Sequence, residues 1–576
     1  MAFSQGVKVA AAAVLCTVIS LLVLLKPTFH QPLVAGPYTI SIEDSPSPKT
    51  PFHVTLTPQF DHENTTSVAV SLRFHPSLEL AVSRNLLFGT SDIANTQALD
   101  IEPGSLHSFD AHGNLSLIPR KTLSSGMTIQ IWSADRDTQG EVTVSYVARA
   151  RYVDQKTQSG PALDFRLEHG GFTTSAFALL LAPADMNRQY NVSLSWDLSS
   201  ALPGTKSVWT YGEGVIATRV LTGMEMLWTY LGAGPLQSFN DREKPFNLCW
   251  FGSAPFSPVE LGRDLYRMFM AMSDFFDDDD DVYRVFIRHN PYPDPFPAKL
   301  MVLAHEMIHN WIIWDLDVDM TADNWYPEGW TEYYSLLFLF KLGIISSEEY
   351  IKQVNHRLAA YYTNPFRLEP LAQVANHTWE FSSAQRLPYR RGFVFALWLD
   401  WLIYSKTDGV NSLDDLVLQL VRRQKTGLKS DPEHFTSILA ELLGSSKLAG
   451  ELCRNVTMGS ILIVPPVNAL KEGRLKLPVT LCRQDQEPFD LGFNETSARS
   501  GGRVIKELDP ASRAAASGLR NGDQMAPTFE IASAESNFDK VIETQFLRPG
   551  GHEWHKISFR PHGWDKWESW CFELDE

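Results

Sequence analysis

The HExxH motif at residues 305–309 limits how this 576-residue chain can fold more than any other stretch. On a helix, residues four apart lie about one turn from each other on the same face, so the imidazoles of His305 and His309 can reach one metal ion. Glu306 follows the first histidine and can turn towards a water molecule on that metal. Apolar neighbours such as Leu303 predict a buried helix. So short a motif also arises by chance, and its meaning depends on a third ligand.

A carboxylate in the segment 327–334 (PEGWTEYY) supplies that ligand. Eighteen residues separate His309 from Glu328. Two histidines and one carboxylate form the open arrangement of catalytic zinc sites, because a fourth position stays free for water or substrate. We therefore predict that His305, His309 and Glu328 hold a zinc ion. Glu332 lies one helical turn beyond Glu328. It could accept a hydrogen bond from a ligand histidine, or it could be an ordinary surface carboxylate.

The chain of 576 residues is too long for one hydrophobic core, which predicts several domains. The hydrophobic period changes along the chain and predicts an α+β protein. Runs such as 68–74 and 141–149 alternate apolar and polar side chains between turn-forming residues, as in an antiparallel β-sandwich. Helical periods follow, with long segments at 259–275, 298–316 and 328–342 and one strand at 282–288. The predicted order is a β-sandwich, a mostly helical catalytic domain, a linker and a C-terminal β domain: residues 37–215, 216–460, 461–480 and 481–576.

These motifs resemble the gluzincin aminopeptidases, and particularly the glycyl aminopeptidase family. The resemblance rests on HExxH, the eighteen-residue gap and the EGWTEYY block that begins at Glu328. It implies an N-terminal β domain, a thermolysin-like catalytic domain and a PDZ domain, in the order predicted above. The segment 389–392 (YRRG) resembles the family's Tyr-x-Lys/Arg-Gly, and 490–493 (DLGF) resembles a PDZ carboxylate-binding loop.

The resemblance also implies roles for single residues in zinc-assisted hydrolysis of a peptide or protein substrate. Glu306 would act as the general base, and Tyr389 would donate a hydrogen bond to the developing oxyanion. A packed core tyrosine is the alternative for Tyr389. Leu491, Gly492 and Phe493 would bind the C-terminal carboxylate of a peptide that adds as a strand. Alternatively, the PDZ-like domain only supports the catalytic domain.

One departure leaves the specificity open. Aminopeptidases of this superfamily carry a Gly-x-Met/Leu-Glu segment whose glutamate grips the substrate's free amine. The corresponding stretch here, 249–255 (CWFGSAP), has no such glutamate, and neither has the strand after it. An amine without a carboxylate partner binds poorly in a closed pocket. Arg288, Arg390 or Arg391 could instead meet a substrate carboxylate, or could simply be solvated.

The N-terminus predicts export. An apolar run at 9–25 lies between Lys8 and Lys26 and spans roughly 26 Å as a helix. We favour an uncleaved signal-anchor, which would be a single-pass membrane anchor, over a signal peptide cleaved near residues 34–36 or a buried helix. The remainder would be lumenal or extracellular. Six glycosylation sequons agree with the secretory pathway: Asn64, Asn114, Asn191, Asn376, Asn455 and Asn494.

Four cysteines outside the apolar run permit two disulfides in an oxidising compartment. Cys453 and Cys482 bracket the predicted linker and are the favoured pair. The alternative is four buried thiols.

Charge and motif together bound the function. A net charge of −17 argues against a nucleic-acid partner, which needs a basic face. The best-supported interpretation is a zinc metallopeptidase, aminopeptidase-like in its motifs. The alternatives are a zinc hydrolase of a non-peptide substrate and a catalytically silent, PDZ-bearing binding protein. Glu306 argues against the silent protein, because holding the metal requires only the ligands.

Overall fold

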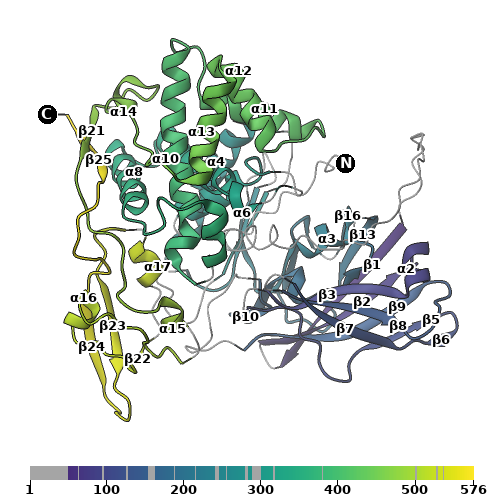
Figure 1. Cartoon of the computed structure of the whole chain (residues 1–576). Coiled ribbons are helices and arrows are strands. Elements are labelled where there is room, and N and C mark those ends of the chain that lie inside the picture. Colours follow the sequence, from purple (N-terminus) through teal and green to yellow (C-terminus); the bar gives the residue numbers. More distant parts are fainter. Residues whose placement is uncertain are drawn as a thin grey trace.

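The computed structural model shows a strand-rich N-terminal part, a helical part and a small C-terminal unit (Figure 1). This confirms the predicted multidomain α+β organisation. The predicted anchor at 9–25 lies outside the described residues. No helix of the described chain has the length and apolar character that a membrane crossing requires. The structure describes residues 50–575 except 62–63, 94–95, 125–126, 153–162, 187, 215, 241–245, 255, 279–282, 289–299, 315–317, 319, 379, 500–501, 527–529 and 536.

The N-terminal part consists of three sheets in the described chain. Their strand orders are β16-β13-β1-β2-β9-β5-β6, β12-β3-β8-β7 with β4 beside β3, and β10-β11-β17-β14-β15. The strands are β1 Thr50–Asp61, β2 Asn64–Phe74, β3 Asn85–Ile93, β4 Thr96–Gln97, β5 His107–Asp110, β6 Gly113–Asn114, β7 Leu117–Ser124, β8 Met127–Ala134, β9 Val142–Arg149, β10 Arg166–Glu168, β11 Gly171–Ser175, β12 Ala182–Pro183, β13 Gln189–Trp196, β14 Lys206–Trp209, β15 Gly212–Glu213, β16 Ile216–Thr222 and β17 Tyr230–Gly234. Short helices α2 Leu78–Ser83, η1 Ala176–Ala178 and α3 Gly223–Leu227 connect them.

Alternating side chains build these sheets as the sequence predicts. In β9, every second residue from Val142 to Ala148 is buried, and side chains from all three sheets share one core. One pairing differs from the predicted antiparallel arrangement, because β1 and β13 run parallel, with Val54 opposite Leu194. These two strands lie far apart in the sequence, so no hairpin fixes their direction.

Strands continue beyond residue 215, where the sequence predicts that helices begin. After β16 and β17 come β18 Gln237–Asn240, β19 Phe246–Trp250 and, after one helix, β20 Tyr283–Ile287, which pairs parallel to β19. Alternate residues of β19 face different cores. Phe246 and Leu248 pack with the helices, whereas Cys249 packs with the N-terminal sheets. This strand therefore joins the two parts.

The helical part contains the predicted metal ligands. Its helices are α4 Pro258–Phe275, α5 Leu300–Ile308, α6 Met320–Asp323, α7 Trp325–Lys341, α8 Ser347–Tyr362, α9 Leu371–Val374, η2 Ala375–His377, α10 Ser382–Lys406, α11 Leu413–Lys425, α12 Pro432–Leu443 and α13 Ser446–Met458. The helix predicted over 298–316 is shorter in the structure, where α5 ends at Ile308. Trp311 instead stacks on Phe276 at 4.8 Å and donates a hydrogen bond to Asp278.

Two glycines let α7 and α10 lie in direct backbone contact. A Cβ on Gly329 would collide with Gly392, and a Cβ on Gly392 would collide with the carbonyl of Trp325. Gly329 follows Glu328, and Gly392 belongs to the YRRG segment. The close approach therefore brings the two sequence motifs to one place in the fold.

The segment predicted as a linker, 461–480, packs on the helical core. It contains α14 Ala469–Glu472, and Leu470, Leu477 and Val479 are buried in that core. Strand β21 Val479–Arg483 follows and pairs with the final strand, β25 Trp570–Leu574. Between them lies the C-terminal unit, residues 484–569, with its own apolar cluster. It contains α15 Glu495–Arg499, α16 Arg513–Ala516, β22 Gln524–Met525, α17 Glu530–Glu535, β23 Ile542–Leu547 and β24 Trp554–Phe559.

Candidate metal centre

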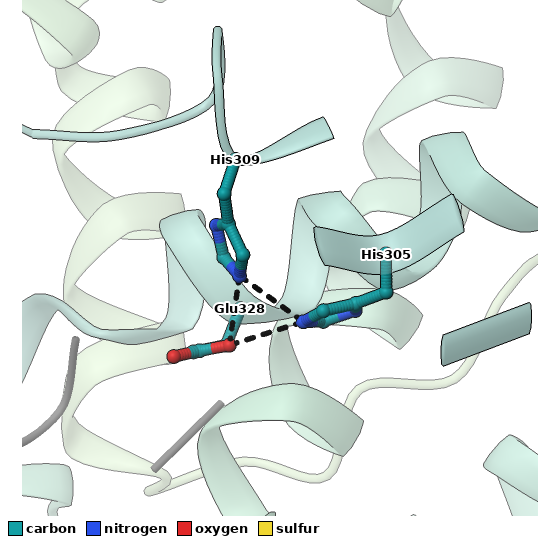
Figure 2. Close-up of side chains that lie close together, drawn as sticks. All are labelled: His305, His309 and Glu328. Atoms are coloured by element: carbon teal, nitrogen blue, oxygen red, sulfur yellow. Dashed lines mark hydrogen bonds and ion pairs between the residues drawn. The ribbon is translucent and has the colours of Figure 1, made fainter. Parts of the chain in front are cut away.

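Helices α5 and α7 bring the three predicted ligands together, as Figure 2 shows. His305 lies in α5, His309 follows its end, and Glu328 lies in the first turn of α7. The two histidine Nε2 atoms are 3.1 Å apart. The Glu328 Oε2 atom is 3.3 Å from Nε2 of His305 and 3.4 Å from that of His309. The three side chains thus point their donor atoms at one small space.

This arrangement fits a tetrahedral metal. Bonds of about 2.0–2.2 Å from imidazole nitrogen and carboxylate oxygen place neighbouring ligand atoms roughly 3.3–3.6 Å apart in a tetrahedron. The observed separations of 3.1 to 3.4 Å are close to that spacing. The Glu328 Oε1 atom is buried and has no hydrogen-bond partner in the described chain. All three side chains are buried. A bound ion would therefore supply the buried polar atoms with interactions that the fold alone does not provide.

The charges of the ligand set also suit a cation. Burial disfavours the ionised form of Glu328, but hydrogen bonds from His305 and His309 outweigh it and hold its pKa at about 2. Burial lowers the pKa of His309, but the hydrogen bond and charge of Glu328 outweigh that effect and raise it. Glu328 is therefore ionised, whereas His309 keeps its proton more firmly without a metal. A metal ion would compete with that proton for the imidazole nitrogen.

Glu332 is not an exposed surface carboxylate. One of its oxygens lies 3.7 Å from Nδ1 of His305, on the side of the ring away from Glu328. The other accepts a 2.5 Å hydrogen bond from Arg357 of α8. Burial raises the pKa of Glu332, but the charges of Arg357 and Arg390 outweigh it and lower that pKa to about 2. A fixed anion thus faces the outer nitrogen of a predicted ligand, which is how such histidines are oriented.

Glu306 and Tyr389 are both buried, and Glu306 lies close enough to His309 for its charge to raise the pKa of that histidine. Glu306 is close enough to Tyr230 of β17 and Tyr283 of β20 for its charge to raise the pKa of both hydroxyls, in addition to the larger effect of burial. The ring of Tyr389 lies 5.8 Å from the ring of His305, with a 19° angle between their planes. The structure therefore brings together the predicted ligands, base and oxyanion tyrosine.

The three arginines considered for substrate binding are bound to groups of the protein itself. Arg288 donates to Asp164 and to Thr173. Arg391 donates to backbone carbonyls, including those of Arg367 and Glu369. Arg390 lies 3.9 Å from Glu332 and 3.8 Å from Glu535 of the C-terminal unit.

Two residues near the centre are not evident from the motifs. Arg357 carries a weak signal, because it lies on the apolar face of α8 that also includes Val354 and Leu358, where a charge needs a partner. Glu535 carries none, since α17 is short and distant in the sequence from the HExxH motif.

The predicted carboxylate-binding loop has other contacts. Leu491 and Phe493 are buried in the C-terminal cluster. Gly492 adopts a φ of 76°, and its N–H donates to the side chain of Asp490 at 2.8 Å. The chain then enters α15 rather than a strand to which a peptide could add. The structure thus does not confirm a PDZ-like domain.

The sequons and cysteines are spread over the surface and the cores. Asn114, Asn191 and Asn376 are exposed, whereas Asn455 and Asn494 are partly buried and the side chain of Asn64 is not described.

The four described cysteines are free thiols. Cys453 of α13 accepts a hydrogen bond from Thr436 of α12. Cys482 lies opposite Cys571 in the pairing of β21 with β25, so its observed neighbour is not the favoured Cys453.

Comparison with known families confirms the resemblance found in the sequence. Residues 298–391 match the M61 glycyl aminopeptidase family. That segment includes the predicted ligands, Glu306, Glu332 and Tyr389. The match supports a peptidase. None of the curated protein sequences compared with this chain matches it.

One solved structure shows a related fold. An aminopeptidase N family protein from Idiomarina loihiensis is 13% identical, with a TM-score of 0.58 over 91% of this chain and 98% of that chain. A zinc metallopeptidase of the M1 family from Deinococcus radiodurans is 14% identical, with a TM-score of 0.44 over 72% of this chain and 94% of that one. Leukotriene A4 hydrolase from Saccharomyces cerevisiae is 13% identical, with a TM-score of 0.44 over 74% and 70%. At these identities, the similarity to the first protein shows the fold alone.

Proposed function

We propose that this protein is a zinc metallopeptidase of the gluzincin type, with zinc held by His305, His309 and Glu328. One observation carries the proposal: three buried donor atoms converge to within 3.1–3.4 Å inside the segment that matches the glycyl aminopeptidase family. The donor set is the open one of catalytic zinc sites. Zinc there would supply the Lewis acidity that activates water and polarises a carbonyl.

Residues of the chain itself carry out proton transfer, stabilisation of the oxyanion and orientation of a ligand. Glu306 takes a proton from the attacking water and passes it to the leaving amine. Tyr389, next to His305, donates a hydrogen bond to the oxygen that gains negative charge. Glu332 orients His305 through Nδ1, and Arg357 and Arg390 keep Glu332 ionised. None of these roles requires a residue outside the helical part.

The proposed substrate is a peptide, cleaved in an aminopeptidase-like manner, with the exported remainder of the chain facing an oxidising compartment. The motifs support an exopeptidase, whereas the missing amine-binding glutamate in 249–255 does not. The C-terminal unit is proposed as a PDZ-like support for the catalytic part.

A peptide library tests the proposal. The full chain and its Glu306→Gln variant are incubated with peptides of free and blocked N-termini, and products are identified by mass spectrometry. The variant is a matched control, because Glu306 is not a ligand and glutamine has nearly the same shape. We expect stepwise loss of N-terminal residues by the wild type alone. Internal cleavage by the wild type alone would make the protein an endopeptidase.

A negative result is equally informative. If both proteins contain zinc and neither cleaves any peptide, the peptidase proposal fails. A non-peptide hydrolase or a silent binding protein would then explain the centre better.

A further inference from the structure

Two cysteines lie directly opposite each other where the C-terminal unit joins the helical part. In the antiparallel pair of β21 and β25, Cys482 is the partner of Cys571, between the pairs Leu481–Phe572 and Arg483–Trp570. Opposite residues in such a pair have side chains on the same face, with Cα atoms about 4.5 or 5.5 Å apart. Disulfides bridge Cα separations of about 4.4–6.8 Å. The register therefore satisfies the main geometric requirement for a disulfide.

We propose that Cys482 and Cys571 form a disulfide that closes the base of the C-terminal unit. Both side chains are partly exposed, so a soluble oxidant can reach them. Cys249, in contrast, is buried in the N-terminal core. Cys453 lies on α13 against Thr436. The other two described cysteines thus lack either the access or a facing partner.

The present contacts of the two sulfur atoms are weak. The Cys482 thiol lies 3.8 Å from the carbonyl of Thr480 and also bonds the Glu573 carboxylate, and the Cys571 thiol lies 3.3 Å from the side-chain oxygen of Gln484. A thiol is a poor donor, so little is lost when the side chains rotate towards each other.

The reaction is thiol–disulfide exchange with a small-molecule disulfide such as oxidised glutathione. One cysteine thiolate attacks a sulfur of the small molecule and releases one small-molecule thiolate. The second cysteine thiolate attacks the mixed disulfide at the protein sulfur and releases the other. Two cysteine thiols lose two protons and two electrons, and one small disulfide is reduced to two thiols. No other reactant is needed.

The surroundings favour a structural bond over a reactive one. Burial and the Glu573 carboxylate raise the pKa of both thiols. A thiol of high pKa is a poor leaving group, so a disulfide between two such thiols resists attack once it has formed. The bond would enclose the whole C-terminal unit in one covalent loop.

The position also ties that unit to the helices. Asn355 of α8 makes two hydrogen bonds with the backbone of Phe572, at 2.9 and 2.8 Å, and Phe572 follows Cys571. A disulfide at this point would hold both ends of the C-terminal unit against α8. It would thereby preserve the placement of α17, whose Glu535 faces Arg390. The inference does not depend on peptidase activity.

Peptide mapping tests the proposal on the full chain. The protein is incubated with oxidised glutathione, free thiols are alkylated, and tryptic fragments are analysed without reduction. We expect fragment 477–483 linked to fragment 567–576, about 2 Da lighter than the sum of the two thiol forms, and lost on reduction. A Cys453→Ser variant is the matched control and should retain the linked pair.

Other outcomes overturn the proposal. These are recovery of both fragments with alkylated thiols or glutathione adducts, and linkage of Cys482 to Cys453. A thermal measurement adds a second readout: reduction should lower the melting temperature of the oxidised wild type but not that of Cys571→Ser. Equal melting temperatures for the oxidised and reduced wild type would contradict a structural bond.

Discussion

Arg390 of α10 lies 3.8 Å from the carboxylate of Glu535, which belongs to α17 of the C-terminal unit. The same guanidinium lies 3.9 Å from Glu332, and Glu332 lies 3.7 Å from Nδ1 of His305. A line of alternating charges therefore runs from the C-terminal unit to a proposed zinc ligand. Through this line, a change of charge in the C-terminal unit can alter the electrostatics of the metal centre.

Removing the charge of Glu332 should weaken metal binding. A Glu332→Gln variant loses the anion that faces His305, and we expect a zinc affinity about 10–100-fold lower. Competition with a chelator measures that affinity. Glu433→Gln, at an exposed position of α12, is the control and should bind zinc like the wild type. An unchanged affinity in Glu332→Gln would show that the 3.7 Å contact does not orient the ligand.

A change in the C-terminal unit should have a smaller effect of the same sign. Glu535→Gln leaves Arg390 with one anionic partner fewer, so the site becomes more positive. We expect zinc affinity to fall about two- to fivefold. Glu553→Gln, exposed in the same unit, should have no effect. If Glu535→Gln and Glu553→Gln bind zinc equally well, the C-terminal unit does not act on the metal centre through this line.

The hydroxyl of Tyr389 should matter for turnover rather than for folding or metal binding. Tyr389→Phe keeps the ring that lies against His305 but removes the proposed oxyanion donor. We expect kcat to fall about 100–1000-fold, with zinc content and KM little changed. Steady-state kinetics on a cleaved peptide measures this. Tyr404→Phe, near the other end of α10, serves as control. A kcat loss of equal size in both variants would contradict the assigned role.

Stability of the C-terminal unit should depend on the pH range between about 6.5 and 4. Burial and the Arg560 charge lower the pKa of His562 to about 4. Because an unfolded histidine has a pKa of about 6.5, the folded state favours the neutral ring. The stabilisation is complete above pH 6.5 and is lost as the pH falls towards 4, by about 3 kcal/mol in total. Urea unfolding at several pH values should show a flatter dependence in His562→Gln, and identical slopes would refute the assignment.

The sequence predicts the metal centre better than it predicts the fold around it. HExxH, the eighteen-residue gap and YRRG are local patterns: helical spacing predicts that His305 and His309 share one face, whereas Glu328 and Tyr389 are assigned from their motifs and the family resemblance. Packing explains why both motifs contain a glycine. Only residues without a Cβ at 329 and 392 let the backbones of α7 and α10 come into contact. Local chemistry and long-range packing agree here.

Features that depend on distant contacts are the ones the sequence cannot supply. The parallel pairing of β1 with β13 joins strands more than a hundred residues apart. The stretch 461–480 reads as a linker because of its prolines, yet Leu470 and Leu477 are buried against the helices. The pairing of Cys482 with Cys571 likewise follows from strand register rather than from spacing. Each of these is decided by tertiary packing that overrides local propensity.

Zinc content and peptide hydrolysis, measured on the same samples, test the central claim most directly. The full chain is purified, stripped with a chelator and resupplied with zinc, beside Glu306→Gln. We predict one zinc per chain in both proteins, and hydrolysis by the wild type that disappears on stripping and returns with zinc. The variant should hold zinc without hydrolysis. Undiminished hydrolysis by the stripped protein, or by Glu306→Gln, would contradict the account.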